Sequence, residues 1–338
     1  MNDSSALDLA PVPEAAAPAT FSATARPNNP LRGIAYLCGG VFIFNVHDIC
    51  VKWLSGSYPL TEVLMVRSAT AAPLLLAVVL VDAGLRALAS SHVGAAVQRA
   101  VTLLVGYLVY YMGLADIPFA DATALYMSVP LVIVALAGPF LGERVGLMRW
   151  LAVLVGFLGV LIMLHPGLGV FRPAGLLILL CAFLYSAGMV MGRRLGATMP
   201  ASVMAFYSNG IFLVSAGALG LVFTALQLPS SGSGSIDFLL RPWVLPTWHD
   251  LAMMITAGFA AAVGIALLTF AYREAEATIV ASFEYTALIW AVIFGYVVWG
   301  DVPGAATVIG AALIVGAGLV ALWAGRDASS AQQSSEGG

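Results

Sequence analysis

Residues 120–143 read ADATALYMSVPLVIVALAGPFLGE, an apolar run with no charged residue between Asp121 and Glu143. A helix needs about 20 mostly apolar residues to cross the hydrocarbon core of a bilayer. This run has that length, and it ends in the pair Gly142-Glu143. It therefore predicts a membrane-spanning helix over Ala122–Leu141, and the rest of the sequence can be compared with it.

The composition of the whole chain agrees with this segment. Of 338 residues, 61% are hydrophobic and only 9% are charged, whereas about 25% of the residues of a soluble domain are charged. The polar surface is too small to face water on all sides, so we expect an all-α membrane protein with the lipid bilayer as its surroundings. The net charge of −3 gives no reason to expect a nucleic-acid partner.

The three cysteines, Cys38, Cys50 and Cys181, all lie in apolar runs. Their spacing fits neither a metal site nor a disulfide framework, so we expect no metal and no cofactor. Nor does the sequence contain a Ser/His or HExxH constellation or a nucleotide-binding Walker motif. An intramembrane enzyme is therefore a weak alternative, and we expect a monomeric protein that is not an enzyme and acts on a small molecule.

Ten segments have the length and apolar character of membrane-spanning helices. We expect them at Gly33–Leu54, Leu60–Val81, Ala100–Ala115, Ala122–Leu141, Gly146–Leu164, Ala174–Gly192, Ala201–Leu226, Leu251–Tyr272, Thr278–Trp299 and Val302–Trp323. The third is short and could extend through Pro118. The tails at 1–31 and 325–338 are rich in small and polar residues, and we expect them to be disordered.

Basic residues predict the orientation, because cytoplasmic loops are enriched in Lys and Arg. With the N-terminus inside, ten of the 14 basic residues face the cytoplasm: Arg26, Arg32, Arg86, Arg99, Arg144, Arg149, Arg193, Arg194, Arg273 and Arg326. Three face outward, namely Lys52, Arg172 and Arg241, and Arg67 lies within a span. We therefore expect a bacterial inner-membrane protein with both termini in the cytoplasm and a flexible outer loop at Gln227–Asp250.

The chain also resembles two copies of one five-helix unit, over residues 32–165 and 173–324. Residues 275–301 read AEATIVASFEYTALIWAVIFGYVVWGD, so Ala-Asp-Ala-Thr at 120–123 is matched by Ala-Glu-Ala-Thr at 275–278. The ending Gly142-Glu143 is matched by Gly300-Asp301. Because five is odd, the second copy must enter the membrane from the opposite side. Such inverted repeats place a substrate site near the midplane and permit alternating access.

These residues carry a resemblance to a known family. Ile117–Tyr126, Pro130, Leu141–Arg144, Trp150 and Gly156–Val160 together resemble the EamA domain of the drug/metabolite transporter superfamily. The resemblance implies ten helices, cytoplasmic termini, a central cavity, and export or exchange of metabolites such as amino acids.

The second half departs from the family pattern in two places. Asp301 replaces the usual Glu, and the usual proline is absent around Leu288. The region of Asn45, His47-Asp48 and Lys52 is also similar to members that carry S-adenosylmethionine, so uptake of that metabolite stays open beside amino-acid export.

Charged and polar residues within the spans are candidate functional groups, because a charge at the bilayer centre costs about 2.5–3.5 kcal/mol or more. Asn45, Asp48 and Lys52 share one helix face. Asp48 and Arg67 lie at matched depths, roughly 10 Å from the same membrane surface. We expect these two to pair, either to lock two helices together or to meet substrate or a proton.

His47 should point about 100° away from Asp48, as a polar contact between helices or a proton relay. Lys52 and Glu62, nearer the surface, should form a hydrated ion pair or reach toward water. Glu284 is the one acid deep in the second half, where it could hold a proton or bind a substrate ammonium group.

Aromatic and hydroxyl side chains complete the candidate set. They are Tyr107, Tyr111, Tyr126, Ser128, Tyr185, Ser186, Tyr285 and Trp290. Apolar walls with a few polar tips suit an amphipathic metabolite, although each residue alone is compatible with ordinary helix packing. Pro130 removes a backbone donor and can leave carbonyl groups facing a midplane cavity.

Overall fold

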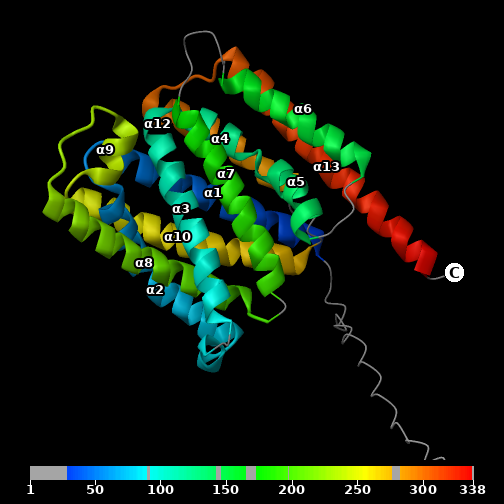
Figure 1. Ribbon diagram of the computed structural model, residues 1–338, viewed down its shortest axis with the longest axis horizontal. Helices are drawn as coiled ribbons and strands as arrows, with labels where there is room; N and C mark the ends of the chain where they lie inside the picture. The colour runs from blue at the N-terminus through cyan, green and yellow to red at the C-terminus, as the bar shows by residue number, and fades with distance from the viewer. Residues whose placement is uncertain are drawn as a thin grey trace, which may run out of the picture.

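The computed structural model describes residues 29–89, 92–141, 146–164, 173–196, 198–275 and 282–336, and this part of the chain contains helices and no strand (Figure 1). The elements are α1 (Pro30–Leu54), α2 (Leu60–Asp82), η1 (Leu85–Leu88), α3 (Val93–Asp116), α4 (Phe119–Tyr126), α5 (Val129–Leu141), α6 (Leu147–Leu164), α7 (Pro173–Leu195), α8 (Ala201–Leu226), α9 (Gly234–Leu240), α10 (Trp248–Glu274), η2 (Glu284–Thr286), α12 (Ala287–Trp299) and α13 (Ala305–Glu336).

The expected all-α membrane fold is confirmed. Within the described ranges, nine helical segments are long and apolar enough to cross a membrane, and Glu284–Trp299 is a shorter apolar one. Residues 278–281 of the ninth expected span lie outside the described part. Helix α1 starts with ordinary capping chemistry: the Asn29 side chain accepts a hydrogen bond from the Arg32 N–H group at 3.2 Å, and Pro30 begins the helix.

Helix α3 begins at Val93, earlier than expected, and ends at Asp116 without reaching Pro118. Arg99, placed in a cytoplasmic loop by the sequence, therefore lies inside this helix. Its guanidinium group donates from Nε to Gly188 O at 3.1 Å and from Nη1 to Ser208 Oγ at 3.2 Å. These contacts with α7 and α8 satisfy the charged group, which is why the helix can continue through it.

Two of the expected spans are interrupted. The fourth is divided into α4 and α5 by a turn at Met127-Ser128, directly before Pro130. The ninth contains the 3₁₀ turn η2, followed by α12. The two interruptions lie at corresponding positions of the two sequence copies. The second occurs without a proline at 288, so proline chemistry is not needed for it.

The connection between α8 and α10 is folded, contrary to the expected flexible loop. It contains α9, whose Phe238 is completely buried. The Asp237 carboxylate accepts hydrogen bonds from Ser230 Oγ at 2.5 Å and from the Ser231 N–H group at 2.7 Å. The Ser235 N–H group donates to Asp116 Oδ2 at 3.0 Å. These contacts hold α9 against the end of α3, at one end of the bundle (Figure 1).

Small residues permit close packing of α6 against α13, which lie side by side along one flank (Figure 1). A Cβ atom added to Gly159 would lie 2.7 Å from Gly310 O, so the two backbones approach too closely for a larger residue. Helix α13 also continues to Glu336 and includes residues 325–336, which the sequence assigns to a tail. Extending an existing helix adds one hydrogen bond per residue, without a new nucleation cost.

Candidate functional site

A buried polar network joins α1 and α2. Arg67 and His47 are 7% and 2% exposed, and Arg67 Nε donates a hydrogen bond to His47 Nε2 over 3.1 Å. His47 Nδ1 lies 2.9 Å from Asp48 Oδ1. The three side chains therefore form a continuous line from guanidinium through imidazole to carboxylate.

The hydrogen-bond contacts define the protonation state of the His47 imidazole. Arginine is always protonated, so its Nε–H group is the donor and His47 Nε2 must accept. The imidazole is then neutral in this arrangement and carries its hydrogen on Nδ1, from which it donates to Asp48. A neutral ring links the two opposite charges.

Two sequence expectations are wrong here. Asp48 and Arg67 do not pair directly, since no ion pair joins them in the described part of the chain. His47 does not point away from Asp48 but bonds to it. The imidazole reaches Arg67 while the shorter Asp48 side chain turns back toward its neighbour, because buried polar groups must find partners.

Helix α3 adds three tyrosines to this network. Tyr110 Oη donates to Asp48 Oδ2 at 3.3 Å, and Tyr111 Oη donates to Asp48 Oδ1. Tyr111 Oη also lies 3.1 Å from His47 Nδ1. The Tyr107 ring instead lies under the Arg67 guanidinium group, with 5.0 Å between Cζ and the ring centroid.

The tyrosines continue as a line of touching rings, called here the tyrosine ladder: Tyr107, Tyr111, Tyr110, Tyr126 and Tyr185. Successive ring centroids are 4.4, 4.9, 5.4 and 5.8 Å apart. The ladder passes from α3 through α4 to α7. Glu284 interacts electrostatically with its last two members. The ladder thus connects the charged groups of the first repeat to the acid of the second.

Several buried polar atoms near this line have no hydrogen-bond partner within the described residues: Arg67 Nη1, Tyr107 Oη, Ser128 Oγ and Asn45 Oδ1. An unsatisfied buried polar atom costs about 1–3 kcal/mol. Such atoms are candidate contacts for a bound molecule or for water. Arg67 Nη1 is the charged one among them, and it adjoins the Asp48 network.

Other candidates have structural surroundings. Tyr285 points toward α13, where its hydroxyl lies against Gly318. Trp290 packs edge-on against Phe42, with ring centroids 4.8 Å apart. Ser186 Oγ donates to Ala182 O at 2.6 Å and lies 3.2 Å from Val129 O, next to the α4–α5 interruption.

Lys52 and Glu62 do not form the expected ion pair. Lys52 Nζ donates to Leu114 O at 2.6 Å and to Ile117 O at 2.5 Å, so the cation caps the end of α3. Glu62 Oε2 accepts from the Val244 N–H group at 3.1 Å.

Tyr110 was expected to share a helix face with Tyr107 and Tyr111, and the structure brings all three to the Asp48–Arg67 network. Arg99 and Phe212 were not among the candidate residues. Arg99 gave no signal, because its helix was expected to begin after it. Phe212 contacts Arg67 from α8, with 5.9 Å between Cζ and the ring centroid, and no local pattern predicts that.

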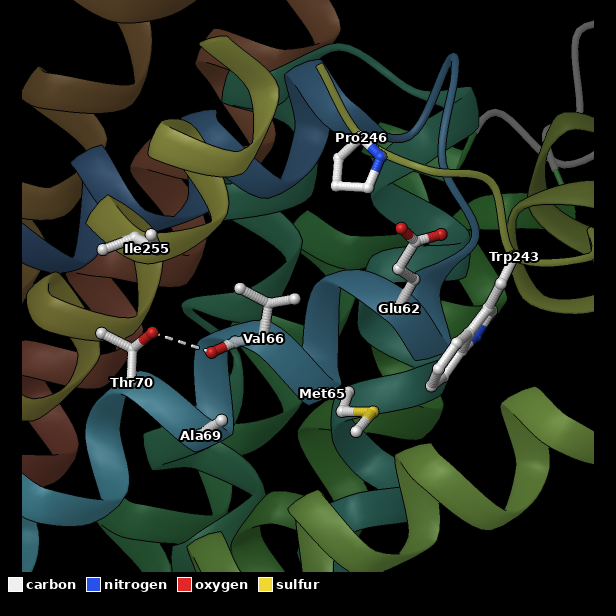
Figure 2. Close-up of a pocket in the computed structure, with 8 residues that line it drawn as sticks. All are labelled: Glu62, Met65, Val66, Ala69, Thr70, Trp243, Pro246 and Ile255. Atoms are coloured by element: carbon white, nitrogen blue, oxygen red, sulfur yellow. Dashed lines mark hydrogen bonds between the residues drawn. The ribbon is translucent and has the colours of Figure 1, made fainter. Parts of the chain in front are cut away.

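The tyrosine rings, which we expected to line a midplane cavity, pack against one another. Two hollows lie elsewhere among the described residues. One, of about 540 Å³, is lined by α2, α10 and the segment 243–246 (Figure 2). The other, of about 360 Å³, lies between α4, α12 and α13.

Comparison with known proteins gives consistent results. The model of the EamA-like transporter family matches residues 31–165 and 172–323. An S-adenosylmethionine uptake transporter of Rickettsia prowazekii (strain Madrid E) is 25% identical over 90% of this chain and 97% of its own. The pseudopaline exporter CntI of Pseudomonas aeruginosa (strain UCBPP-PA14) is 30% identical over 80% and 88%.

A riboflavin transporter of Rhizobium johnstonii is 30% identical over 67% of this chain and 69% of its own. A protein of known crystal structure superposes with a TM-score of 0.58, covering 87% of this chain and 98% of that one at 20% identity. The structural likeness concerns the fold alone.

Proposed function

The chain belongs to the EamA-like transporter family, and we propose that it is a secondary transporter that exports or exchanges amino acids or similar zwitterionic metabolites. The named relatives carry different small metabolites, so membership of the family indicates a metabolite transporter without identifying the substrate. The substrate class must be inferred from the residues of the candidate site. In this proposal the protein is a monomer in a bacterial inner membrane, with both termini in the cytoplasm.

One observation supports a zwitterionic substrate. Arg67 and Asp48 place one charge of each sign in a single buried network, and Arg67 Nη1 has no hydrogen-bond partner within the described residues. A substrate carboxylate fits the free guanidinium donor, and an ammonium group fits the Asp48 side, which is 21% exposed. A polyanion would want several basic groups at this depth, and the network offers one.

The ladder suits the variable part of such a substrate. Tyr107, Tyr110, Tyr111, Tyr126 and Tyr185 present apolar ring faces with polar edges. Apolar walls discriminate by only about 1–3 kcal/mol per methylene, so we expect broad selectivity that includes hydrophobic amino acids. Glu284, at the far end, is proposed to hold a proton or to meet the ammonium group during passage.

The two interrupted spans support alternating access. Discontinuous helices at corresponding positions of two repeats commonly flank a transport site. The turn at Met127-Ser128 and the 3₁₀ turn at Glu284–Thr286 fit that arrangement, since Tyr126 and Glu284 adjoin them. We propose that the halves of each interrupted helix move separately, opening the ladder first to one side and then to the other.

Uptake of S-adenosylmethionine is the second candidate. Relatives named for it match nearly the whole chain. The molecule has an α-amino carboxylate, which suits the same pair of charges, and a sulfonium cation, which suits tyrosine faces. The geometry therefore fits either substrate.

Transport into proteoliposomes tests both candidates. The panel contains labelled leucine, phenylalanine and glutamate, S-adenosylmethionine, and a nucleotide sugar as the polyanion. We expect flux of neutral amino acids that Arg67→Gln and Asp48→Asn each reduce at least tenfold. Arg241→Gln, on the connection outside the network, serves as the matched control and should keep full flux.

Flux of S-adenosylmethionine alone would replace amino acids with the second candidate. Flux of the nucleotide sugar without any amino acid would reject the zwitterion proposal.

A further inference from the structure

The hollow of about 540 Å³ beside α2 is separate from the charged network and has a distinct chemistry. Figure 2 shows Met65, Val66, Ala69 and Thr70 of α2 along one side, with Ile255 of α10, Pro246 and Trp243 around them. These are mostly apolar walls of a size common for small-molecule sites. Among the described residues that line the hollow, Glu62 is the one with an ionisable side chain.

The wall formed by the segment 243–246 is held in place by hydrogen bonds. The Trp243 N–H group donates to Thr224 Oγ1 at 3.0 Å, and its indole Nε1 donates to Thr61 Oγ1 at 2.9 Å. The Val244 N–H group donates to Glu62 Oε2 at 3.1 Å. The hollow is therefore preformed, which lowers the ordering cost of binding.

Glu62 is 6% exposed. No Lys, Arg or His of the described residues lies within 4.0 Å of its carboxylate. Its oxygens lie between Pro246 and Trp243 in Figure 2. A buried carboxylate with one backbone donor and no cation is incompletely compensated, so a positive charge placed in the hollow would be attracted to it.

We propose that this hollow binds an amphipathic organic monocation. Its positive centre would lie between the Glu62 carboxylate and the Trp243 indole, where ion pairing and cation–π attraction combine. Its apolar part would pack on Met65, Val66 and Ile255. A neutral molecule of the same shape gains only the apolar contact, and an anion is repelled by Glu62.

The position of the hollow indicates the route to it. It is lined by the first three turns of α2, and Ile255, which also lines it, is 44% exposed. A cation with an apolar part collects at the membrane interface, so it can enter from the side without crossing the tyrosine ladder.

The test measures binding of benzyltrimethylammonium and of its neutral isostere neopentylbenzene to the purified full-length protein by equilibrium dialysis. We expect the wild type to prefer the cation at least tenfold and Glu62→Gln to abolish that preference. The Gln amide oxygen can still accept from Val244, so the wall stays in place and only the charge is lost. Trp243→Leu should weaken cation binding about two- to fivefold.

A control variant makes the result decisive. Asp301→Asn removes an acid outside both sites and should leave the cation preference unchanged. Equal binding of the two probes to the wild type overturns the proposal. So does a preference that survives in Glu62→Gln, and thermal unfolding of each variant verifies that it is folded.

Discussion

His47 lies between Arg67 and Asp48 as a neutral bridge, accepting a hydrogen bond at Nε2 over 3.1 Å and facing the carboxylate at 2.9 Å. This arrangement differs from a direct ion pair because it leaves one guanidinium donor of Arg67 available for a bound molecule. The imidazole accepts from the Arg67 Nε–H group, and Nη1 of the same side chain has no hydrogen-bond partner in the described part of the chain. The network therefore keeps one charged donor that a substrate can take.

His47→Phe should destabilise the protein and impair transport. It leaves Arg67 Nε without its partner, at about 1–3 kcal/mol for an unsatisfied buried group. It also removes one of the two donors to Asp48 Oδ1, the other being Tyr111. The measurement is thermal unfolding in detergent together with amino-acid flux. The chain offers a matched control, because His249 also adjoins an aspartate, Asp250, at 3.5 Å but its side chain is 77% exposed. His249→Phe should be close to neutral, and equal effects of the two changes would contradict the bridge.

Tyr111→Phe and Tyr107→Phe should differ although the residues are neighbours on one helix face. The Tyr111 hydroxyl bonds both Asp48 and His47, so its removal should lower the free energy of unfolding by about 1–2 kcal/mol. The Tyr107 hydroxyl has no partner among the described residues, so its removal should change stability little. Comparing the two unfolding temperatures tests the assignment, which fails if Tyr107→Phe is the more damaging.

Much of the fold could be predicted from the sequence because membrane helices need long apolar runs, and these are visible residue by residue. The interruptions were harder. Pro130 gave a local signal for the break at Met127-Ser128, whereas the 3₁₀ turn at Glu284 has none and follows from packing. The start of α3 was missed because Arg99 resembles a loop residue until its partners on α7 and α8 are known.

The sequence was sufficient to predict which residues belong to the site. It was not sufficient to predict which of their side chains contact one another. Depth along α1 and α2 correctly brought Asp48 and Arg67 to one level. Rotation about side-chain bonds decides which groups contact one another, and a helical wheel gives no information on that rotation. The hydrogen-bonded bridge through His47 was therefore not predicted. The tyrosines of α3 followed from their spacing, but their contacts with Tyr126 and Tyr185 depend on how three helices pack.

Gly318→Ala should destabilise the contact between η2 and α13. The added methyl group would overlap the Tyr285 hydroxyl and lie 2.7 Å from its Cζ. Overpacking of this kind costs about 1–3 kcal/mol. Tyr285→Phe in the same chain should restore part of the loss, because the hydroxyl it removes has no hydrogen-bond partner in the described part. Gly316→Ala, where nothing lies within 4 Å, is the control, and the unfolding temperatures of the three variants and the wild type provide the readout.

The connection carrying α9 should stay folded at mildly acidic pH. Hydrogen bonds from Ser230 and Ser231 hold the pKa of Asp237 at about 2, below its ordinary value of 3.8. A lowered pKa means that the ionised form stabilises the folded turn. That contribution is complete above about pH 4 and is lost as the pH falls through about 2. Limited proteolysis should find the connection equally protected at pH 7 and pH 5, and more accessible at pH 7 in Asp237→Ala. Loss of protection already at pH 5 would contradict this assignment.

The orientation in the membrane is the last prediction. Basic residues are concentrated on one side of the expected topology, and cytoplasmic loops attract Lys and Arg. Moving Arg99 from a loop into α3 leaves the asymmetry in place, since it still lies near the end of the helix on the same side. We therefore expect both termini in the cytoplasm and α9 outside. Reporter fusions at residue 240 and at the C-terminus test this, because alkaline phosphatase is active only outside and green fluorescent protein is fluorescent only inside. A fluorescent fusion at residue 240, or an active phosphatase at the C-terminus, would reverse the orientation.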